Sequence, residues 1–338
     1  MGEYERQHFV PKLLQRFFST DGQSIWCYSL STKECIQSSI RTTAQKSWYY
    51  KFDDKEKTVL EHWLGEMEDD VAPVLGRLVN DKNYQLAGDE YELCFGFALV
   101  QLMRTPKAIQ AMKHVYEFCK QRLIPAVMEE VNKGVRTDKN IPFQTVIGVS
   151  SVIDSWPGKT MLVLRNETDD ELIMSDNPAC LFSPIHAFAE KAVLTDLLIK
   201  QPSFSGNMLY LSISPSCGLL LYDERYYKFS CNYTYNLTPE DVHSLNSLVI
   251  RNASNILLLR GESFSEDSYN EDFEFRKTEE FRVKQKTVYT PVDENFCLSA
   301  LNCDKEFWKY LICDEAAKFP EATFPKVEGL TYDKYGKE

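Results

Sequence analysis

Apolar residues spaced three and four apart predict a long helix over residues 55–80, because that spacing places them on one helix face. Pro73 lies inside this span and should kink or split the helix near Val71. A second helix is expected after Asp89, where residues 93–100 are apolar on every side, and such a helix packs centrally. The apolar face of the first helix is formed by Leu60, Leu64, Met67, Val71, Val74 and Leu78.

Prolines set the limits of two other predicted helices. Pro106 should interrupt the second helix and separate it from a third over residues 107–132. Pro11 is expected in the first turn of a short amphipathic helix over residues 9–18. Further helices are expected near 184–199, 239–259 and 304–318.

Short apolar segments predict strands. Residues 24–30 and 34–37 should pair as a hairpin across Ser31, Thr32 and Lys33. Together with the helices, these segments predict an α+β fold, in which a helical layer is packed on a mainly antiparallel sheet. The helix at 239–259 is expected to close the core. Other strands are predicted at 142–148, 160–165, 171–175, 208–213 and 219–222.

Composition narrows the class of protein. The chain has 338 residues, of which 43% are hydrophobic, so it can bury a substantial core. It contains no apolar run of the ~18 residues that span a membrane, and its charged first ten residues do not resemble a secretory signal. None of its ten cysteines forms a CxxC pair, so a zinc ribbon or thioredoxin-like motif is unsupported. These features predict a cytoplasmic protein with reduced thiols and no membrane partner.

Charge is distributed unevenly along the chain. The net charge of −12 argues against a globally basic surface that coats nucleic acid. Residues 101–140 nevertheless hold eight Lys or Arg against four Asp or Glu, so nucleic acid remains a partner for this segment. Residues 262–338 hold eighteen acids against eleven bases. We therefore predict a core domain over 1–261 and an acidic C-terminal extension over 262–338, entered through a linker at 263–270. The extension, with one short helix, is a candidate surface for a protein partner.

Two glutamates border the apolar face of the first long helix. Glu61 and Glu68 are seven residues apart, so they project in nearly the same direction. Two carboxylates beside a core have raised pKa values unless a cation, a donor or a metal is near them. The pair therefore needs a partner.

The second helix offers one. Gln101 lies on an interior line of that helix, and Arg104 follows just before Thr105 and Pro106. A guanidinium near the core needs acceptors, which Glu61 or Glu68 can supply. One interpretation is a buried ion-pair network that fixes the helix pairing. The other is a pocket in which Arg104 holds a phosphate or carboxylate while the glutamates bind a metal or transfer protons.

A carboxylate also lies where a predicted strand must stop. Pro178 cannot continue a strand, and it drives Asn177 toward extended geometry, so the chain turns just after Asp176. Ser175 and Asp176 are then suited either to an ordinary turn or to a cleft-facing role.

His8 is the remaining unusual polar residue, because it directly precedes the apolar Phe9 and Val10. It is a candidate cap for the short helix, a candidate hydrogen-bond partner of a core carbonyl, and a candidate proton donor or acceptor. The five histidines show no HxxxH or HExxH spacing, and the chain has no GxSxG, P-loop or GxGxxG motif. The signatures of zinc hydrolases, serine hydrolases, NTPases and dinucleotide-binding proteins are therefore missing.

The order of these motifs resembles a mostly bacterial family, the domain of unknown function 4238. The similarity rests on H-F-V-P at residues 8–11, the paired glutamates, Q-x-x-R-T-P at 101–106 and S-D-N-P at 175–178. Leu14, Phe17, Asn246 and Ala253 add to it. It covers residues 7–260 and departs from the family in the stretch 181–186. The resemblance implies that these polar residues belong to one module, but it implies no activity.

Two hypotheses of function follow. The first is a non-catalytic intracellular binding or regulatory module with a polar pocket, acting in a bacterial defence or toxin system. Its site residues would be Glu61, Glu68, Gln101, Ser175 and Asn177.

The alternative is a metal-assisted phosphodiesterase, a nuclease-type toxin or anti-phage effector. In this hypothesis Asp176 and Glu68 would hold Mg²⁺ or Mn²⁺, because hard cations prefer carboxylate oxygens. His8 would transfer protons and Arg104 would stabilise phosphate charge. His8, Arg104 and Asp176 would then be the catalytic residues, gathered in one cleft. Transferase chemistry on a nucleotide or a small metabolite is a third class that no motif distinguishes.

Overall fold

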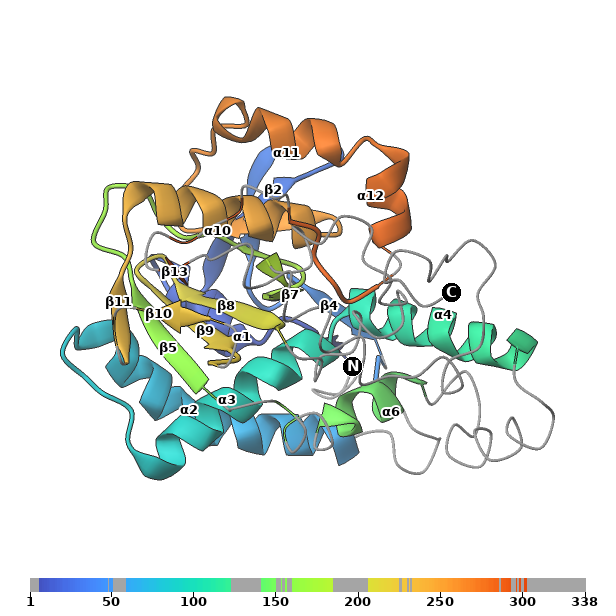
Figure 1. Ribbon diagram of the computed structural model, residues 1–338, viewed down its shortest axis with the longest axis horizontal. Helices are drawn as coiled ribbons and strands as arrows, with labels where there is room; N and C mark the ends of the chain where they lie inside the picture. Colours follow the sequence, from blue (N-terminus) through green and yellow to red (C-terminus); the bar gives the residue numbers. More distant parts are fainter. Residues whose placement is uncertain are drawn as a thin grey trace, which may run out of the picture.

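A five-stranded sheet at the centre of the protein lies between two layers of helices (Figure 1). In spatial order its strands are β11 (Thr234–Asn236), β5 (Thr160–Arg165), β9 (Cys217–Tyr222), β8 (Met208–Ser214) and β7 (Ala179–Phe182). Strands β11 and β5 are parallel, and the other neighbours are antiparallel. The structure, a computed structural model, describes residues 6–47, 49–50, 59–122, 141–149, 153, 156, 160–184, 206–224, 227–229, 231, 233–285, 287–292, 296, 298 and 301–302.

Both faces of this sheet are buried. Helices α1 (Lys12–Phe17), α2 (Val59–Asn80) and α3 (Gly88–Met103) cover one face, and α10 (Pro239–Asn252) covers the other. Alternate residues of β8 therefore enter different cores: Leu209 lies with the first group of helices and Tyr210 with α10. Strands buried on both sides are apolar throughout, which explains why β5, β8 and β9 show no alternation of polar and apolar residues. The α+β fold with a mainly antiparallel sheet is confirmed.

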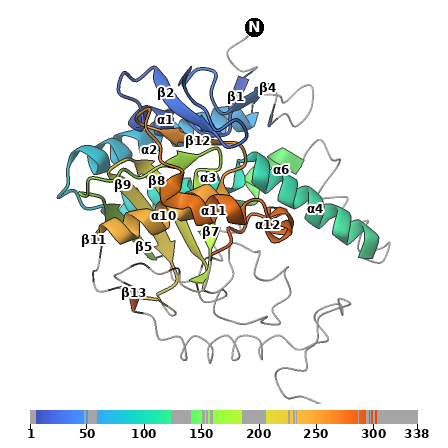
Figure 2. The ribbon, with the colours of Figure 1, turned by 90° about the horizontal axis from the view of Figure 1, so that it is seen from above.

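A second sheet of four antiparallel strands contains β3 (Cys35–Ser39), β2 (Ser24–Ser29), β12 (Ile256–Leu259) and β6 (Met174–Ser175), in that order. The predicted hairpin is present as β2 and β3. Two pairs of short strands complete the described sheets: β1 (Arg6–His8) with β4 (Gln45–Ser47), and β10 (Lys228–Phe229) with β13 (Leu301–Asn302). Strands β1, β2 and β4 lie beside helix α1 (Figure 2).

Proline acts differently at its two positions in the helical layer. Pro106 separates α3 from α4 (Pro106–Arg122), as predicted, because it has no N–H for the preceding helix but fits the first turn of the next. Pro73 lies inside α2, which runs without a break from Val59 to Asn80, so the predicted split near Val71 is absent. Leu75 and Leu78, beyond the proline, remain fully buried in the core.

Two predictions of secondary structure were wrong. Residues 142–148 were expected to form a strand, but Ile141–Ile147 is helix α6, in which the hydroxyl of Thr145 donates to the carbonyl of Ile141. A short apolar run does not distinguish a strand from a buried helix turn, and Pro142 fits a first helical turn. The helix expected over 239–259 ends at Asn252, and residues 256–259 form the buried strand β12.

Residues 270–275 pack on α10. The segment 263–270 was predicted to be a linker, but it contains the short helix η3 (Asp267–Tyr269), and α11 (Asn270–Phe275) and α12 (Glu279–Lys284) follow. Asp272 of α11 pairs with Arg251 of α10, which fixes this segment to the core. The helices predicted at 184–199 and 304–318, and residues 123–132 of the third helix, lie outside the described residues. None of the helices that the structure describes is long and apolar enough to cross a membrane.

Candidate functional site

Arg104 is buried at the junction of α3 and α4. It caps the C-terminus of α3, and only 1% of its surface is exposed. Its Nη1 donates to Oε1 of Glu68 at 2.6 Å, and its Nη2 donates to the backbone carbonyl of His8 at 2.6 Å. Its Nε donates to the hydroxyl of Tyr50 at 3.4 Å. All three guanidinium nitrogens therefore have partners within the protein. We call His8, Tyr50, Glu61, Glu68 and Arg104 the Arg104 cluster.

Glu61 and Glu68 lie on α2 and both face Arg104, but only Glu68 makes the ion pair. Burial, together with the neighbouring charge of Glu68, raises the pKa of Glu61 to about 7, although the charges of Arg104 and Lys12 oppose the shift. The Oε2 atom of Glu61 is buried and has no hydrogen-bond partner. This carboxyl group can therefore exchange a proton near neutral pH or accept a hydrogen bond from a bound molecule.

His8 enters the cluster from β1. Its ring Nε2 lies 3.2 Å from the carbonyl oxygen of Ile40, and its side chain is buried. Burial, together with the positive charges of Lys12 and Arg104, lowers the pKa of His8 to about 4. The ring is therefore neutral at pH 7. Its contact with the carbonyl oxygen of Ile40 stabilises the turn there.

Several buried polar atoms on the segments that form this cluster have no hydrogen-bond partner among the described residues. The oxygen of the Gln7 amide accepts a hydrogen bond from the backbone of Tyr50, but its Nε2 is unpaired. Gln101, one helical turn before Arg104, donates weakly to the carbonyl of Phe97, and its Oε1 is unpaired. In folded proteins, buried polar atoms are normally satisfied by protein, water or ligand. The unpaired atoms here are Gln7 Nε2, Tyr49 OH, Glu61 Oε2 and Gln101 Oε1.

Asp176 lies elsewhere, at the end of β6. Its Oδ1 accepts the backbone N–H of Ser254 at 2.8 Å, and its Oδ2 accepts the backbone N–H of Asn255 at 2.8 Å. The side chain of Asn255 donates to the same Oδ2 at 3.2 Å. Burial raises the pKa of Asp176, and these hydrogen bonds counter the shift. The carboxylate thus forms the turn between α10 and β12.

The residues next to Asp176 complete the same turn. The hydroxyl of Ser175 donates to the carbonyl of Asn177, and the backbone N–H of Asn177 donates back to it. The amide of Asn177 donates to the carbonyl of Asn252 at 3.0 Å. Asn252 in turn donates to the carbonyls of Asn177 and Ala179, both at 2.9 Å. We call Ser175, Asp176, Asn177, Asn252, Ser254 and Asn255 the Asp176 cluster.

Lys107 connects the helical layer with the Asp176 cluster. Its Nζ is buried and donates to Oδ1 of Asn252 at 2.6 Å and to the carbonyl of Tyr289 at 3.5 Å. Burial lowers the pKa of Lys107 to about 8. Lys107 follows Arg104 by three residues, yet the two cations serve different clusters. Within the described part of the chain, no hydrogen bond or ion pair joins the Arg104 cluster to the Asp176 cluster.

The predicted site residues are thus divided. His8, Glu61, Glu68 and Arg104 come together, with Gln101 one turn away, whereas Ser175, Asp176 and Asn177 form a separate turn. Each guanidinium nitrogen of Arg104 already has one partner within the protein, and Glu68 balances its charge. The described residues include no group of three or more His, Cys, Asp or Glu side chains placed to hold a metal ion.

Comparison with protein families decides the relationship of the chain. Residues 6–262 match the model described as "Protein of unknown function (DUF4238)", and this span is more than half of the 338 residues. The chain belongs to this family. Comparisons with curated proteins and with solved structures gave no match.

The DUF4238 span contains both clusters, and it shows what the sequence left unnoticed. Tyr50, which lies in none of the predicted elements, supplies a ring and a hydroxyl to Arg104. Asn246 was expected to belong to the module, and its amide holds the backbone of Glu171 and Ile173. Lys107 carried a signal that could have been used, because a cation directly after Pro106 lies in the first turn of a buried helix. Nothing in the sequence marked Tyr50.

Proposed function

We propose that this DUF4238 protein is a non-catalytic binding module whose ligand contacts the Arg104 cluster. One observation carries the proposal: Glu61 of the cluster, and Gln7, Tyr49 and Gln101 on the segments that meet at it, each have a buried polar atom with no hydrogen-bond partner in the described part of the chain. Buried polar atoms without partners destabilise a protein, so their retention beside one rigid cluster favours a role in holding a ligand.

The charges of the cluster favour a particular ligand chemistry. Arg104 is engaged by Glu68, so an anionic ligand would have to break an existing ion pair. Glu61 offers an unpaired carboxyl oxygen, and Gln101 offers an unpaired amide oxygen. Both accept hydrogen bonds. The ligand is therefore neutral or cationic and carries N–H or O–H donors.

Apolar substitutions distinguish a binding role from a structural one. Glu61→Leu and Gln101→Leu each remove a buried oxygen that has no partner among the described residues, and Gln101→Leu loses only the weak bond to Phe97, so each should raise the free energy of unfolding, by about 0.5–2 kcal/mol. Glu68→Leu, seven residues from Glu61 on the same helix face, is the matched control. It leaves Arg104 buried and unpaired and should lower the free energy of unfolding by about 3 kcal/mol. Urea denaturation measures all three.

The same three variants also define the result that would contradict the binding proposal. If Glu61→Leu and Gln101→Leu destabilise the protein as much as Glu68→Leu, the two side chains belong to the structural network. The binding proposal would then be abandoned.

The rival hypothesis, a metal-assisted phosphodiesterase acting as a toxin or defence effector, needs Arg104 to release Glu68 and Asp176 to release the turn at Ser254. It has its own test. If Mg²⁺ or Mn²⁺ raises the melting temperature of the wild-type protein but not that of Asp176→Asn, metal binding at Asp176 is established. That result would replace the binding module with the phosphodiesterase.

A further inference from the structure

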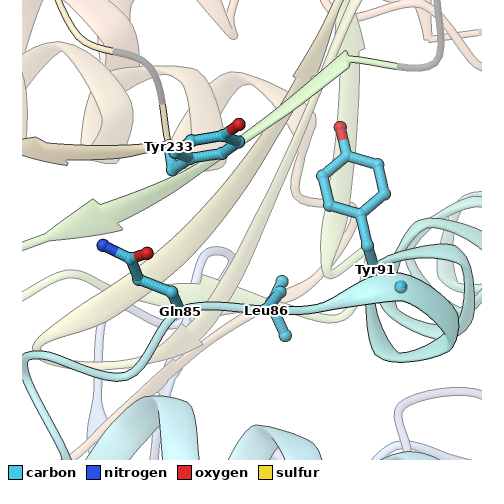
Figure 3. A pocket seen from close by; sticks show the side chains of 5 residues that line it. Gln85, Leu86, Tyr91 and Tyr233 are labelled. Carbon is cyan, nitrogen blue, oxygen red and sulfur yellow. The ribbon is translucent and has the colours of Figure 1, made fainter.

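A cavity lies at the opposite end of α3 from Arg104. It has a volume of about 470 Å³, which is within the range of small-molecule sites. Two tyrosine rings form its walls: Tyr91 from the first turn of α3, and Tyr233 from the segment just before β11 (Figure 3). Gln85 and Leu86, from the loop between α2 and α3, form its floor beneath Tyr233 in this view.

Strand β5 holds the walls of this cavity in place. The carbonyl of Tyr233 accepts the backbone N–H of Val163 at 2.9 Å. Tyr91 forms a hydrogen bond with the backbone of Met161, two residues earlier in the same strand. Because β5 is an interior strand of the five-stranded sheet, both tyrosines are anchored to the most rigid part of the fold. The cavity is therefore formed before any ligand binds.

The floor is also anchored to β5. Arg165, which is buried at the end of that strand, donates to the carbonyl of Leu78 in the last turn of α2 and to those of Asp81 and Tyr84 in the loop. At the edge of the loop, the carboxylate of Glu90 accepts a hydrogen bond of 2.5 Å from the hydroxyl of Tyr84. Burying a guanidinium costs free energy unless it is hydrogen-bonded, and here the carbonyls that it bonds fix the shape of the loop.

We propose that this cavity binds a small neutral saccharide, with the ring of Tyr233 as the stacking platform. Tyr233 is 63% exposed, which is unusual for so large an aromatic residue and leaves its face open to a ligand. The electron-rich face of a tyrosine attracts the weakly positive C–H face of a sugar ring. The amide of Gln85 has both donor and acceptor atoms for the hydroxyl groups at the sugar's edge.

The surroundings argue against two other ligands. A flat nucleobase is best held between parallel rings, but Tyr233 is seen edge-on in Figure 3 while Tyr91 shows its face, so the two rings are not parallel. An anionic ligand is disfavoured, because no described lining residue is cationic. In addition, the negative charges of Glu92 and Glu224 are close enough to Tyr91 to help raise its pKa. A neutral, hydroxyl-rich ring fits both conditions.

Titration of the full chain with the methyl glycosides of glucose, galactose, mannose and N-acetylglucosamine tests this proposal, with saturation-transfer NMR as the readout. At least one glycoside should bind the wild-type protein. Tyr233→Ala should weaken that binding about tenfold, since an aromatic stacking partner contributes on that order, whereas Tyr233→Phe should keep it. Ile36→Ala, which removes another exposed apolar side chain from β3, is the control and should bind as the wild type does.

Three results would overturn the proposal: no transfer to any of the four glycosides, equal transfer to wild type and Tyr233→Ala, or transfer to adenosine alone. Because Tyr233 is exposed, its substitution should leave the melting temperature unchanged. Gln85→Ala provides a second variant if that expectation fails, since it removes the edge contact from another segment of the chain.

Discussion

Arg104 and Glu68 form an ion pair in which the Arg104 side chain is buried and the Glu68 side chain is partly exposed to solvent. The side chain of Arg104 is 2% exposed, that of Glu68 is 24% exposed, and their atoms lie 2.6 Å apart although 36 residues separate them in the chain. Loss of either partner therefore has unequal consequences. A stranded Glu68 can be hydrated, whereas a stranded Arg104 cannot.

The first prediction compares substitutions of the two partners, and it counts the other hydrogen bonds of Arg104 as well as the ion pair. Glu68→Gln keeps a neutral acceptor near Arg104 and should lower the free energy of unfolding by about 1–2 kcal/mol. Arg104→Met also removes the donors to His8 and Tyr50, and should cost about 3–5 kcal/mol. Glu66→Gln, on the exposed side of α2, is the control and should change stability by less than about 0.5 kcal/mol. Equal losses for Glu68→Gln and Glu66→Gln would show that the ion pair is not stabilising.

The second prediction follows from the raised pKa of Glu61. Its pKa is about 7 in the folded protein and 4.5 in the reference state, so the folded protein retains a proton that the unfolded chain loses. The stabilising contribution is complete below about pH 4.5 and is lost as the pH rises through 7.

Glu61→Gln removes this dependence. The variant should therefore gain stability relative to the wild type as the pH rises from about 5 to about 8, by roughly 1–3 kcal/mol. His8 titrates with the opposite sign in an overlapping range, because its pKa is depressed, but it does so in both proteins and cancels in the difference. Urea titrations at the two pH values measure the difference. A constant difference would mean that Glu61 is not desolvated.

A third prediction separates a structural Asp176 from a catalytic one. Asp176→Asn places an amide donor against the backbone N–H groups of Ser254 and Asn255, so it should lower the free energy of unfolding by about 2–3 kcal/mol. Asp169→Asn, in an exposed nearby turn, should have almost no effect. A fully stable Asp176→Asn protein would contradict the role that we assign to this turn.

The fourth prediction concerns the chain beyond the family match. Arg276 donates to the carbonyls of Ile250 and Ala253 at 2.7 and 2.8 Å, and so caps the C-terminus of α10. Arg276→Met should cost about 1–3 kcal/mol, since it strands two buried carbonyls. Arg282→Met, in the neighbouring helix, removes only an exposed ion pair and should cost less than about 1 kcal/mol.

Thermal or urea unfolding of the two variants provides the comparison. If Arg276→Met is no more harmful than Arg282→Met, the segment after residue 262 is an attachment rather than a part that stabilises the family's core.

The sequence predicted much of the helical layer, because its signals are local. Pro106 ended one helix and began the next regardless of what surrounded it. Thr238 and Pro239 began α10 through a capping box, in which the side chains of Thr238 and Asp241 bond to backbone N–H groups within the same turn. The end of α10 was not predictable in this way, since the four apolar residues at 256–259, shortly after Asn252, suit a helix or a strand equally.

That ambiguity was resolved by distant contacts. Residues 256–259 form a strand because β2 and β6 provide hydrogen bonds on both sides, and because Asp176, far earlier in the chain, holds the turn before them. A similar contrast applies to the polar residues. The spacing of Glu61 and Glu68 predicted that both project in the same direction, and the position of Arg104 at the end of the next helix made it a candidate partner. The ion pair itself, with Glu68, depends on how the two helices pack.

By itself, the sequence determined where the main helices begin, that two glutamates share a helix face, and that a buried cation must meet an acceptor. Those conclusions depend on helix geometry and on the cost of burying charge, which act within a few turns of chain. Only the tertiary structure decided that Glu68 rather than Glu61 forms the ion pair with Arg104. It also decided that Asp176 accepts hydrogen bonds from Ser254 and Asn255 instead of lying beside the Arg104 cluster. The physical reason is that hydrogen bonds act over about 3 Å, so the packing of whole elements, rather than any local pattern, determines which polar groups meet.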